Sequence, residues 1–221
     1  MTVSHNPDPS LLLDYATGTL ADPFALIVAT HMALCPACRR EVAALEAVGG
    51  ALLEQAVEAG EPAIDETAFE RAMARIEALP PEPAPAPRPA PDAASRFIPR
   101  PLRDRLPASL DKLPWRRQGP VETVFLPCDL PRHRVRVLRI APGRGVPRHT
   151  HRGTELTLVL QGSFSDATGH FLGGDIESAD GELDHRPVAD PGEPCVCLAV
   201  TSAPLRLTGA LGRLIDPFLD I

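Results

Sequence analysis

A run of prolines between residues 80 and 91 restricts the folding of this chain more than any other feature. Seven of the 26 prolines in the 221 residues lie in this run, which reads PPEPAPAPRPAP. Because proline fixes φ and has no N–H, the run cannot form a helix interior or a central strand. We expect a semi-rigid extended spacer. The sequence therefore predicts two domains, residues 1–79 and 96–221, joined by a Pro-rich linker at 80–95.

The first 79 residues have the pattern of helices and no strand-like alternation. Apolar residues recur at helical spacing after Leu11, after Phe24 and after Pro36, and a fourth helix is expected to start near Asp65. The Gly49-Gly50 pair indicates a kink in the third helix. The N-terminal domain is therefore predicted to be all-α.

The pattern changes to short strands from about residue 121. Runs that alternate or are rich in β-branched residues are separated by Gly, Pro and Asp turns. They are 121–126, 134–140, 154–161, 175–179 and 195–200. Short strands at this spacing predict a barrel or a sandwich, which gives an α + β, two-domain chain overall.

Negative charge is concentrated in the first 79 residues. They hold four arginines against twelve Asp and Glu residues, a net charge of −8, whereas residues 80–221 hold 18 Lys and Arg against 17 Asp and Glu, a net charge of +1. The total of −7 excludes a generally basic nucleic-acid-binding protein. An acidic helical domain suits a basic partner, such as a protein that itself binds DNA, although a merely solvated acidic surface has the same composition.

Cysteine usage and the start of the chain favour a cytoplasmic protein. The first residues show neither a basic segment nor an apolar one of the export type, and the longest apolar stretch, Phe24 to Cys35, is about 12 residues, too short to cross a bilayer. The five cysteines favour metal or thiol chemistry in a reducing compartment over a disulfide framework. We therefore expect no membrane partner.

A first metal site is predicted where the second helix meets the third. His31, Cys35 and Cys38 form an HxxxCxxC pattern, in which the histidine and the first cysteine share one helix face. Imidazole and thiolate ligands at a tight turn suit tetrahedral zinc. The fourth ligand is predicted to be His5, the only other histidine in this half, with Asn6 and Asp8 as alternatives. Two buried free thiols beside a core histidine, or a CxxC redox pair, are the other interpretations.

A second metal site is predicted in the strand-rich domain. His149, His151 and Glu155 have the same parity, so on extended backbone their side chains project to one side, and His185 is a plausible fourth ligand. Three imidazoles and one carboxylate bind several divalent metals, so the set does not select one.

The leucines that follow this pattern predict a strand buried on both faces. Leu156, Leu158 and Leu160 have the opposite parity to Glu155. The outer face must then be covered by another strand, by the segment 96–120, or by a second subunit. Cys195 and Cys197 also share a strand face, and we interpret them as small apolar core residues, with thiol sensing as the alternative.

At these positions the sequence resembles the cupin family. Residues Gly143 to Gly162 match the first cupin motif, G(X)5HXH(X)3E(X)6G, at every fixed position. The second motif, G(X)5PXG(X)2H(X)3N, is matched only at Gly174 and His185. The departures from it are Asp180, Glu182 and Ala189, which replace Pro, Gly and Asn and affect turn geometry more than ligation.

The HxxxCxxC pattern, together with His5 and Tyr15…Gly18-Thr-Leu20, resembles a zinc-binding anti-sigma domain. The two domains in this order resemble the ChrR-type anti-sigma factors. That resemblance implies that the helical domain binds an extracytoplasmic-function sigma factor and blocks its access to RNA polymerase. It also implies that the cupin domain responds to oxidative signals such as singlet oxygen.

The resemblance also implies the metals. Zinc would be held by the HxxxCxxC residues and an N-terminal histidine, for which His5 is present, while Asn6 occupies the adjacent position at which a relative can carry the ligand. A divalent ion, zinc by resemblance, would lie in the cupin domain. A homodimer through the cupin domain and no direct contact with nucleic acid are further expectations.

Two other functions use the same residues. A cupin-type metal oxygenase or isomerase with a helical zinc-binding appendage would present an open metal position to substrate. However, the motif strands place no further acid or base clearly, so we expect a protein that is not an enzyme. A metal-binding dimeric structural protein is the third interpretation.

Overall fold

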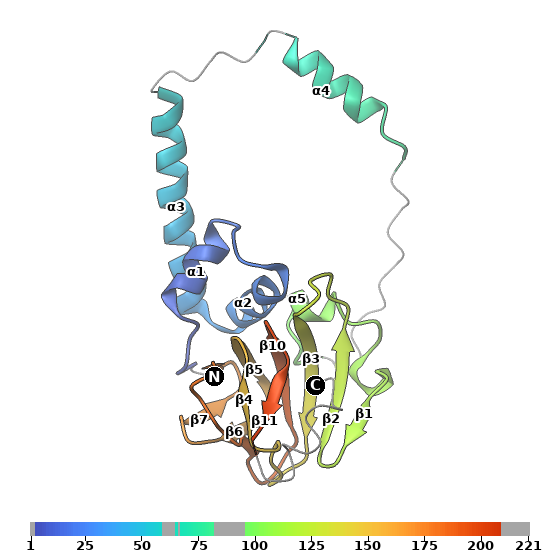
Figure 1. Cartoon of the computed structure of the whole chain (residues 1–221). Helices are drawn as coiled ribbons and strands as arrows, with labels where there is room; N and C mark the ends of the chain where they lie inside the picture. Colours follow the sequence, from blue (N-terminus) through green and yellow to red (C-terminus); the bar gives the residue numbers. More distant parts are fainter. Residues whose placement is uncertain (1–2, 59–64, 66, 82–95, 209–221) are drawn as a thin grey trace. The chain divides into compact units, whose positions relative to one another are not determined.

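A computed structural model describes residues 3–58, 65, 67–81 and 96–208. Its helices are α1 Pro9–Ala16, α2 Asp22–Leu34, α3 Pro36–Glu58, α4 Ala68–Glu77, α5 Arg100–Arg103 and the 3-10 turn Leu110–Lys112 (Figure 1). The chain divides into two compact units, Met1–Leu45 with Pro91–Ile221, and Glu46–Ala90, and α3 crosses from the first to the second. Most of the predicted linker, 82–95, lies outside the described residues, and the predicted domain boundaries remain predictions.

The ends of the first helices follow from local chemistry. The Asp8 carboxylate accepts a hydrogen bond from the Ser10 backbone N–H at 2.8 Å and caps α1, which ends before Gly18 at a φ of 72°. Helix α2 ends at Leu34, and the extended backbone of the next residue, Cys35, is the conformation favoured before a proline. Helix α3 begins at that proline and runs without interruption through the Gly49-Gly50 pair.

The second half of the first unit is built from antiparallel strands. They are β1 Arg116–Gln118, β2 Val121–Leu126, β3 Arg134–Ile140, β4 His149–His151, β5 Glu155–Gln161, β6 Ser163–Ser165, β7 His170–Leu172, β8 Ile176–Ala179, β9 Val188–Ala189, β10 Cys195–Thr201 and β11 Leu205–Leu207. Six form a sheet in the order β1-β2-β3-β10-β5-β8, and the others form a β11-β4 pair and a β7-β6-β9 sheet. All five predicted strands are confirmed. The described strands leave three sheets and do not close into one barrel.

Helix α2 covers one face of the six-stranded sheet. Leu156, Leu158 and Leu160 of β5 belong to a buried cluster that includes Phe24 and Ile27 of α2. The segment before β1 completes the cover with Ile98, Leu102, Leu110 and Leu113. One predicted cover, the segment 96–120, is therefore confirmed, and α2 is an addition that the sequence did not indicate. As Figure 1 shows, α2 lies against the sheet, so the first helices and the sheet share a hydrophobic core.

The opposite face of the sheet encloses a second cluster. Phe164 and Phe171 stack at 4.9 Å between ring centroids and pack with Val159, Cys195 and Cys197. Both thiols are buried, as expected for core residues, and their Sγ atoms lie 3.5 Å apart.

Candidate metal centres

The N-terminal cluster forms where α2 gives way to α3. His31 lies in the last turn of α2, Cys35 separates the two helices and Cys38 lies in the first turn of α3. All three are buried, and their ligand atoms lie within 4.8 Å of one another. His31 Nε2 is 3.3 Å from Cys38 Sγ. The predicted trio is therefore brought together.

The structure does not bring His5 to this cluster. Its ring packs against Phe171 at a tilt of 45°, with 4.6 Å between the ring centroids, and its Nδ1 lies 3.4 Å from an Asp175 carboxylate oxygen. The neighbouring Asn6 takes the position beside the thiols, with its Oδ1 3.4 Å from both Cys35 Sγ and Cys38 Sγ. Asn6 was one of the alternatives that the sequence left open.

The proton positions suit the binding of a cation by His31, Cys35 and Cys38. His31 Nδ1 lies 2.8 Å from the Gly174 carbonyl oxygen, which can only accept, so Nδ1 carries the proton and Nε2 faces the thiols as a lone-pair donor. Burial lowers the pKa of His31 and favours this neutral ring. Burial, together with the adjacent Cys35, raises the pKa of the Cys38 thiol to about 12. A bound cation is what would hold the thiols as thiolates here.

The second cluster gathers the four predicted cupin residues from three segments. His149 and His151 lie on β4, Glu155 begins β5, and His185 lies between β8 and β9 in a backbone bridge with His149. All four side chains are buried. The motif residues converge as their shared parity predicts, although residues 152–154 interrupt the strand and leave β4 and β5 in different sheets.

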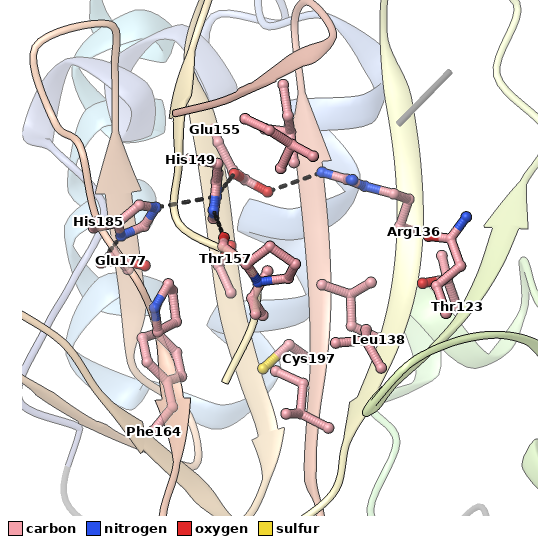
Figure 2. Close-up of a pocket in the computed structure, with 18 residues that line it drawn as sticks. Thr123, Arg136, Leu138, His149, Glu155, Thr157, Phe164, Glu177, His185 and Cys197 are labelled. Atoms are coloured by element: carbon pink, nitrogen blue, oxygen red, sulfur yellow. Dashed lines mark hydrogen bonds and ion pairs between the residues drawn. The ribbon is translucent and has the colours of Figure 1, made fainter. Parts of the chain in front are cut away.

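The rings of His149 and His185 and the carboxylate of Glu155 lie side by side in Figure 2, and His151 joins them. The Nε2 atoms of His149 and His185 are 3.2 Å apart, and Glu155 Oε2 lies 2.6 Å from His151 Nε2 and 3.9 Å from His149 Nε2. Facing lone pairs at these distances repel one another unless a proton or a metal ion lies between them. The donor set suits a divalent transition metal.

Each imidazole is fixed by a contact at its other nitrogen. His149 Nδ1 donates to the Pro147 carbonyl at 2.8 Å and His151 Nδ1 donates to the Asp180 carbonyl at 3.1 Å. His185 Nδ1 lies 2.7 Å from an Asp166 carboxylate oxygen. This pattern is typical of metal-ligating histidines, because it sets the tautomer and leaves Nε2 for the metal.

Charged partners that the sequence did not reveal complete the centre. Arg136 of β3 donates to Glu155 Oε1 at 3.0 Å. Burial alone raises the pKa of Glu155, but the adjacent His149 and His151 rings and the charge of Arg136 outweigh burial and hold that pKa far below its usual range. Glu177 of β8 lies 3.3 Å from His185 Nδ1. Arg136, Asp166 and Glu177 lie outside the motif positions, and no spacing in the sequence marks them.

Comparison with known proteins agrees with this architecture. A family model described as the ChrR cupin-like domain matches residues 105–204. The anti-sigma-E factor ChrR of Cereibacter sphaeroides is 45% identical over 222 residues, which cover all of both chains. This chain belongs to the ChrR-type anti-sigma factors.

A solved structure extends the agreement to three dimensions. The crystal structure of Rhodobacter sphaeroides SigE in complex with the anti-sigma ChrR matches 90% of this chain and 100% of that chain, with a TM-score of 0.74 and 42% identity. Membership of the ChrR-type family places this protein among anti-sigma regulators. No helix in the described parts of the chain has both the length and the apolarity to cross a membrane.

Proposed function

We propose that this protein binds an extracytoplasmic-function sigma factor in the cytoplasm and keeps it from RNA polymerase. The supporting observation is full-length identity of 45% to an anti-sigma-E factor, combined with a three-ligand cluster at the α2–α3 junction. Zinc at His31, Cys35 and Cys38 fixes the direction in which α3 leaves α2. Asn6 is the nearest fourth donor, in place of the expected His5.

Apolar side chains that lack cover in the second unit supply the contact surface. Leu52 and Leu53 on α3 are 61% and 67% exposed, and Phe69 and Ile76 on α4 are 73% and 59% exposed. Large apolar side chains exposed along helices in this way are typical of protein interaction sites. The acidic charge of the same part of the chain steers it toward a basic partner.

The cupin part holds a divalent ion, zinc by resemblance, at His149, His151, Glu155 and His185, and it responds to oxidative signals of the singlet-oxygen type. The supporting observation is a short covalent path between the two clusters. The Gly174 carbonyl accepts from His31, and Glu177, three residues later, contacts His185. Between them, Asp175 accepts from the backbone N–H groups of Ser4 and His5 at 2.6 and 2.9 Å.

The test is complex formation between the full chain and extracytoplasmic-function sigma factors of its source cell, measured by co-purification and by inhibition of sigma-dependent transcription. The wild-type chain forms a stable one-to-one complex. Cys38→Ala loses the complex because the α2–α3 junction is no longer fixed. His149→Ala keeps it and loses only the response to singlet oxygen. Failure of every such sigma factor to bind would refute the function.

Homodimerisation through the cupin part is a separate proposal, and sedimentation of the full chain tests it. Direct binding of nucleic acid is not expected, since the chain carries a net charge of −7. A filter-binding measurement with promoter DNA checks this.

A further inference from the structure

An open cavity lies beside the cupin metal cluster. It encloses about 820 Å³, with the solvent at its mouth included. Most of its wall is apolar, from Val121, Leu138, Ile140, Val146, Phe164 and Leu205. One end is polar, with Arg136, His149, Glu155 and His185 side by side (Figure 2). A pocket of this kind suits a small molecule that has a polar head and an apolar body.

Arg136 is the group at the polar end whose hydrogen bonding is incomplete. Its side chain is 3% exposed, and its Nη2 donates to Glu155. Its Nε has no hydrogen-bond partner in the part of the chain that the structure describes. A buried N–H of a guanidinium is costly to leave unpaired, so the site is one acceptor short.

The charges at this end favour an anionic head. Among the described residues, Arg136 faces the carboxylate of Glu155 through Nη2 alone, which leaves its other N–H groups for a second carboxylate. Glu177 also lines the cavity, but its carboxylate accepts from Thr168 Oγ1 at 3.1 Å and lies against His185. Arginine binds carboxylates through paired N–H donors, which matches the free Nε.

We propose that the cavity binds a small organic acid with an apolar body. Its carboxylate accepts from Arg136 beside the metal cluster, and its hydrocarbon part packs between Leu138, Ile140 and Phe164. The inference deepens the proposed sensing role by giving a ligand class for that site, and it does not require sigma-factor binding to be correct.

The test is calorimetric titration of the full-length, zinc-loaded protein with hexanoate and with benzoate, compared with hexanamide and benzamide. The two acids bind and raise the melting temperature. The two amides have the same shape without the charge and bind at least about tenfold more weakly, as expected for loss of a charge-assisted hydrogen bond. Equal binding of acids and amides, or no binding of either acid, overturns the proposal.

Variants assign the interaction to Arg136. Arg136→Gln weakens acid binding about tenfold or more, and Arg136→Lys restores part of the loss. The matched control is Arg139→Gln on the same strand, because Arg139 bonds Glu122 at 2.6 Å and stacks on Trp115, away from this cavity. It leaves acid binding unchanged. Arg136→Gln protein that folds and binds the acids as wild type does would overturn the assignment.

A second variant keeps the test decisive if Arg136→Gln fails to fold. Leu138→Phe fills the apolar wall and leaves all charges in place, and it lowers acid binding about tenfold. Unchanged binding to this variant would overturn the location. The sigma factor is titrated into the same preparations without acid, so a chain that binds sigma but no acid refutes only this inference.

Discussion

The imidazole of His31 shows how one residue serves both the metal cluster and the sheet. Its Nε2 faces Cys38, while its Nδ1 proton is held by the carbonyl of Gly174, just before β8. The Asn6 amide oxygen, which we propose as the fourth ligand, lies beside the thiols and is a weaker zinc ligand than an imidazole. We therefore expect the fourth ligand to contribute least to zinc affinity.

Replacing Asn6 by histidine should strengthen this weak corner. Asn6→His is expected to tighten zinc binding about tenfold or more, because an imidazole nitrogen replaces an amide oxygen. Competition with a chromogenic chelator measures the affinity. His5→Ala is the control and should leave zinc affinity nearly unchanged. If His5→Ala releases the zinc and Asn6→Ala does not, the assignment of the fourth donor to Asn6 is wrong.

Asp166 should make folding of the metal-free protein sensitive to acid. Burial raises the pKa of Asp166, but hydrogen bonds from Glu177, Thr168 and His185 lower it to about 2. A carboxyl whose folded pKa is depressed stabilises the fold above its unfolded pKa and loses that contribution as pH falls toward the folded value. Asp166→Asn should therefore cost about 2 kcal/mol at pH 7 and flatten the loss of stability between about pH 4 and pH 2. Urea unfolding across this range measures both, and an unchanged slope contradicts the prediction.

The sequence identified the residues of the two candidate metal clusters better than the residues that support them. Seven of the eight predicted ligands lie in the two clusters, since motif spacing fixes residues close together in the chain. Asn6 replaces His5 because the backbone of residues 4–5 binds Asp175, a contact across 170 residues. Arg136 and Glu177 reach the cupin cluster through strand pairing, which no local spacing encodes.

At the scale of elements, helix α2 departs most from the predicted division into a helical domain and a strand-rich domain. One side of it, with Val28, faces the His31–Cys35–Cys38 cluster and α1, while Phe24 and Ile27 enter the core of the sheet. A helix that is apolar on most sides needs partners on both. The sequence predicts such a helix well but does not specify that its second partner lies beyond the Pro-rich run.

Shortening one side chain on α2 should therefore destabilise the sheet. Ile27 is fully buried, so Ile27→Ala is expected to cost about 2–4 kcal/mol of unfolding free energy. The fluorescence of Trp115, which packs against the sheet cluster, reports the unfolding in urea. Leu13→Ala, at a 47% exposed position on α1, is the control and should cost less than about 1 kcal/mol. If Ile27→Ala does not change the urea concentration at which Trp115 fluorescence reports unfolding, the helices and the sheet unfold independently.

The longer strands were predictable and the short ones were not. The five predicted runs correspond to β2, β3, β5, β8 and β10, and all of them are four to seven residues long. The missed strands β1, β4, β6, β7, β9 and β11 have two or three residues. So few residues cannot show a period of two, and their pairing is decided by tertiary contacts.

At the scale of the whole molecule, two metal clusters are separated by one short stretch of chain. Gly174 contacts the N-terminal cluster, Glu177 contacts the cupin cluster, and Asp175 between them accepts from Ser4, His5 and Leu172. A change in the position of His185 can therefore shift the carbonyl that orients His31. Such a connection has a thermodynamic signature that does not depend on the identity of the signal.

The two ions should bind cooperatively and reciprocally. His149→Ala removes a cupin ligand and is expected to weaken zinc binding at the N-terminal cluster about fivefold. Cys38→Ala should weaken binding of the cupin ion by the same factor, because a coupling free energy is shared by both sites. Chelator competition on each variant measures the two factors. Asp175→Asn keeps all ligands, weakens the grip on residues 4 and 5, and should bring both factors close to one. If each variant binds the ion at the other site as tightly as wild type does, the stretch 174–177 does not couple the two sites. If His149→Ala and Cys38→Ala weaken binding by different factors, one of the two substitutions acts by unfolding.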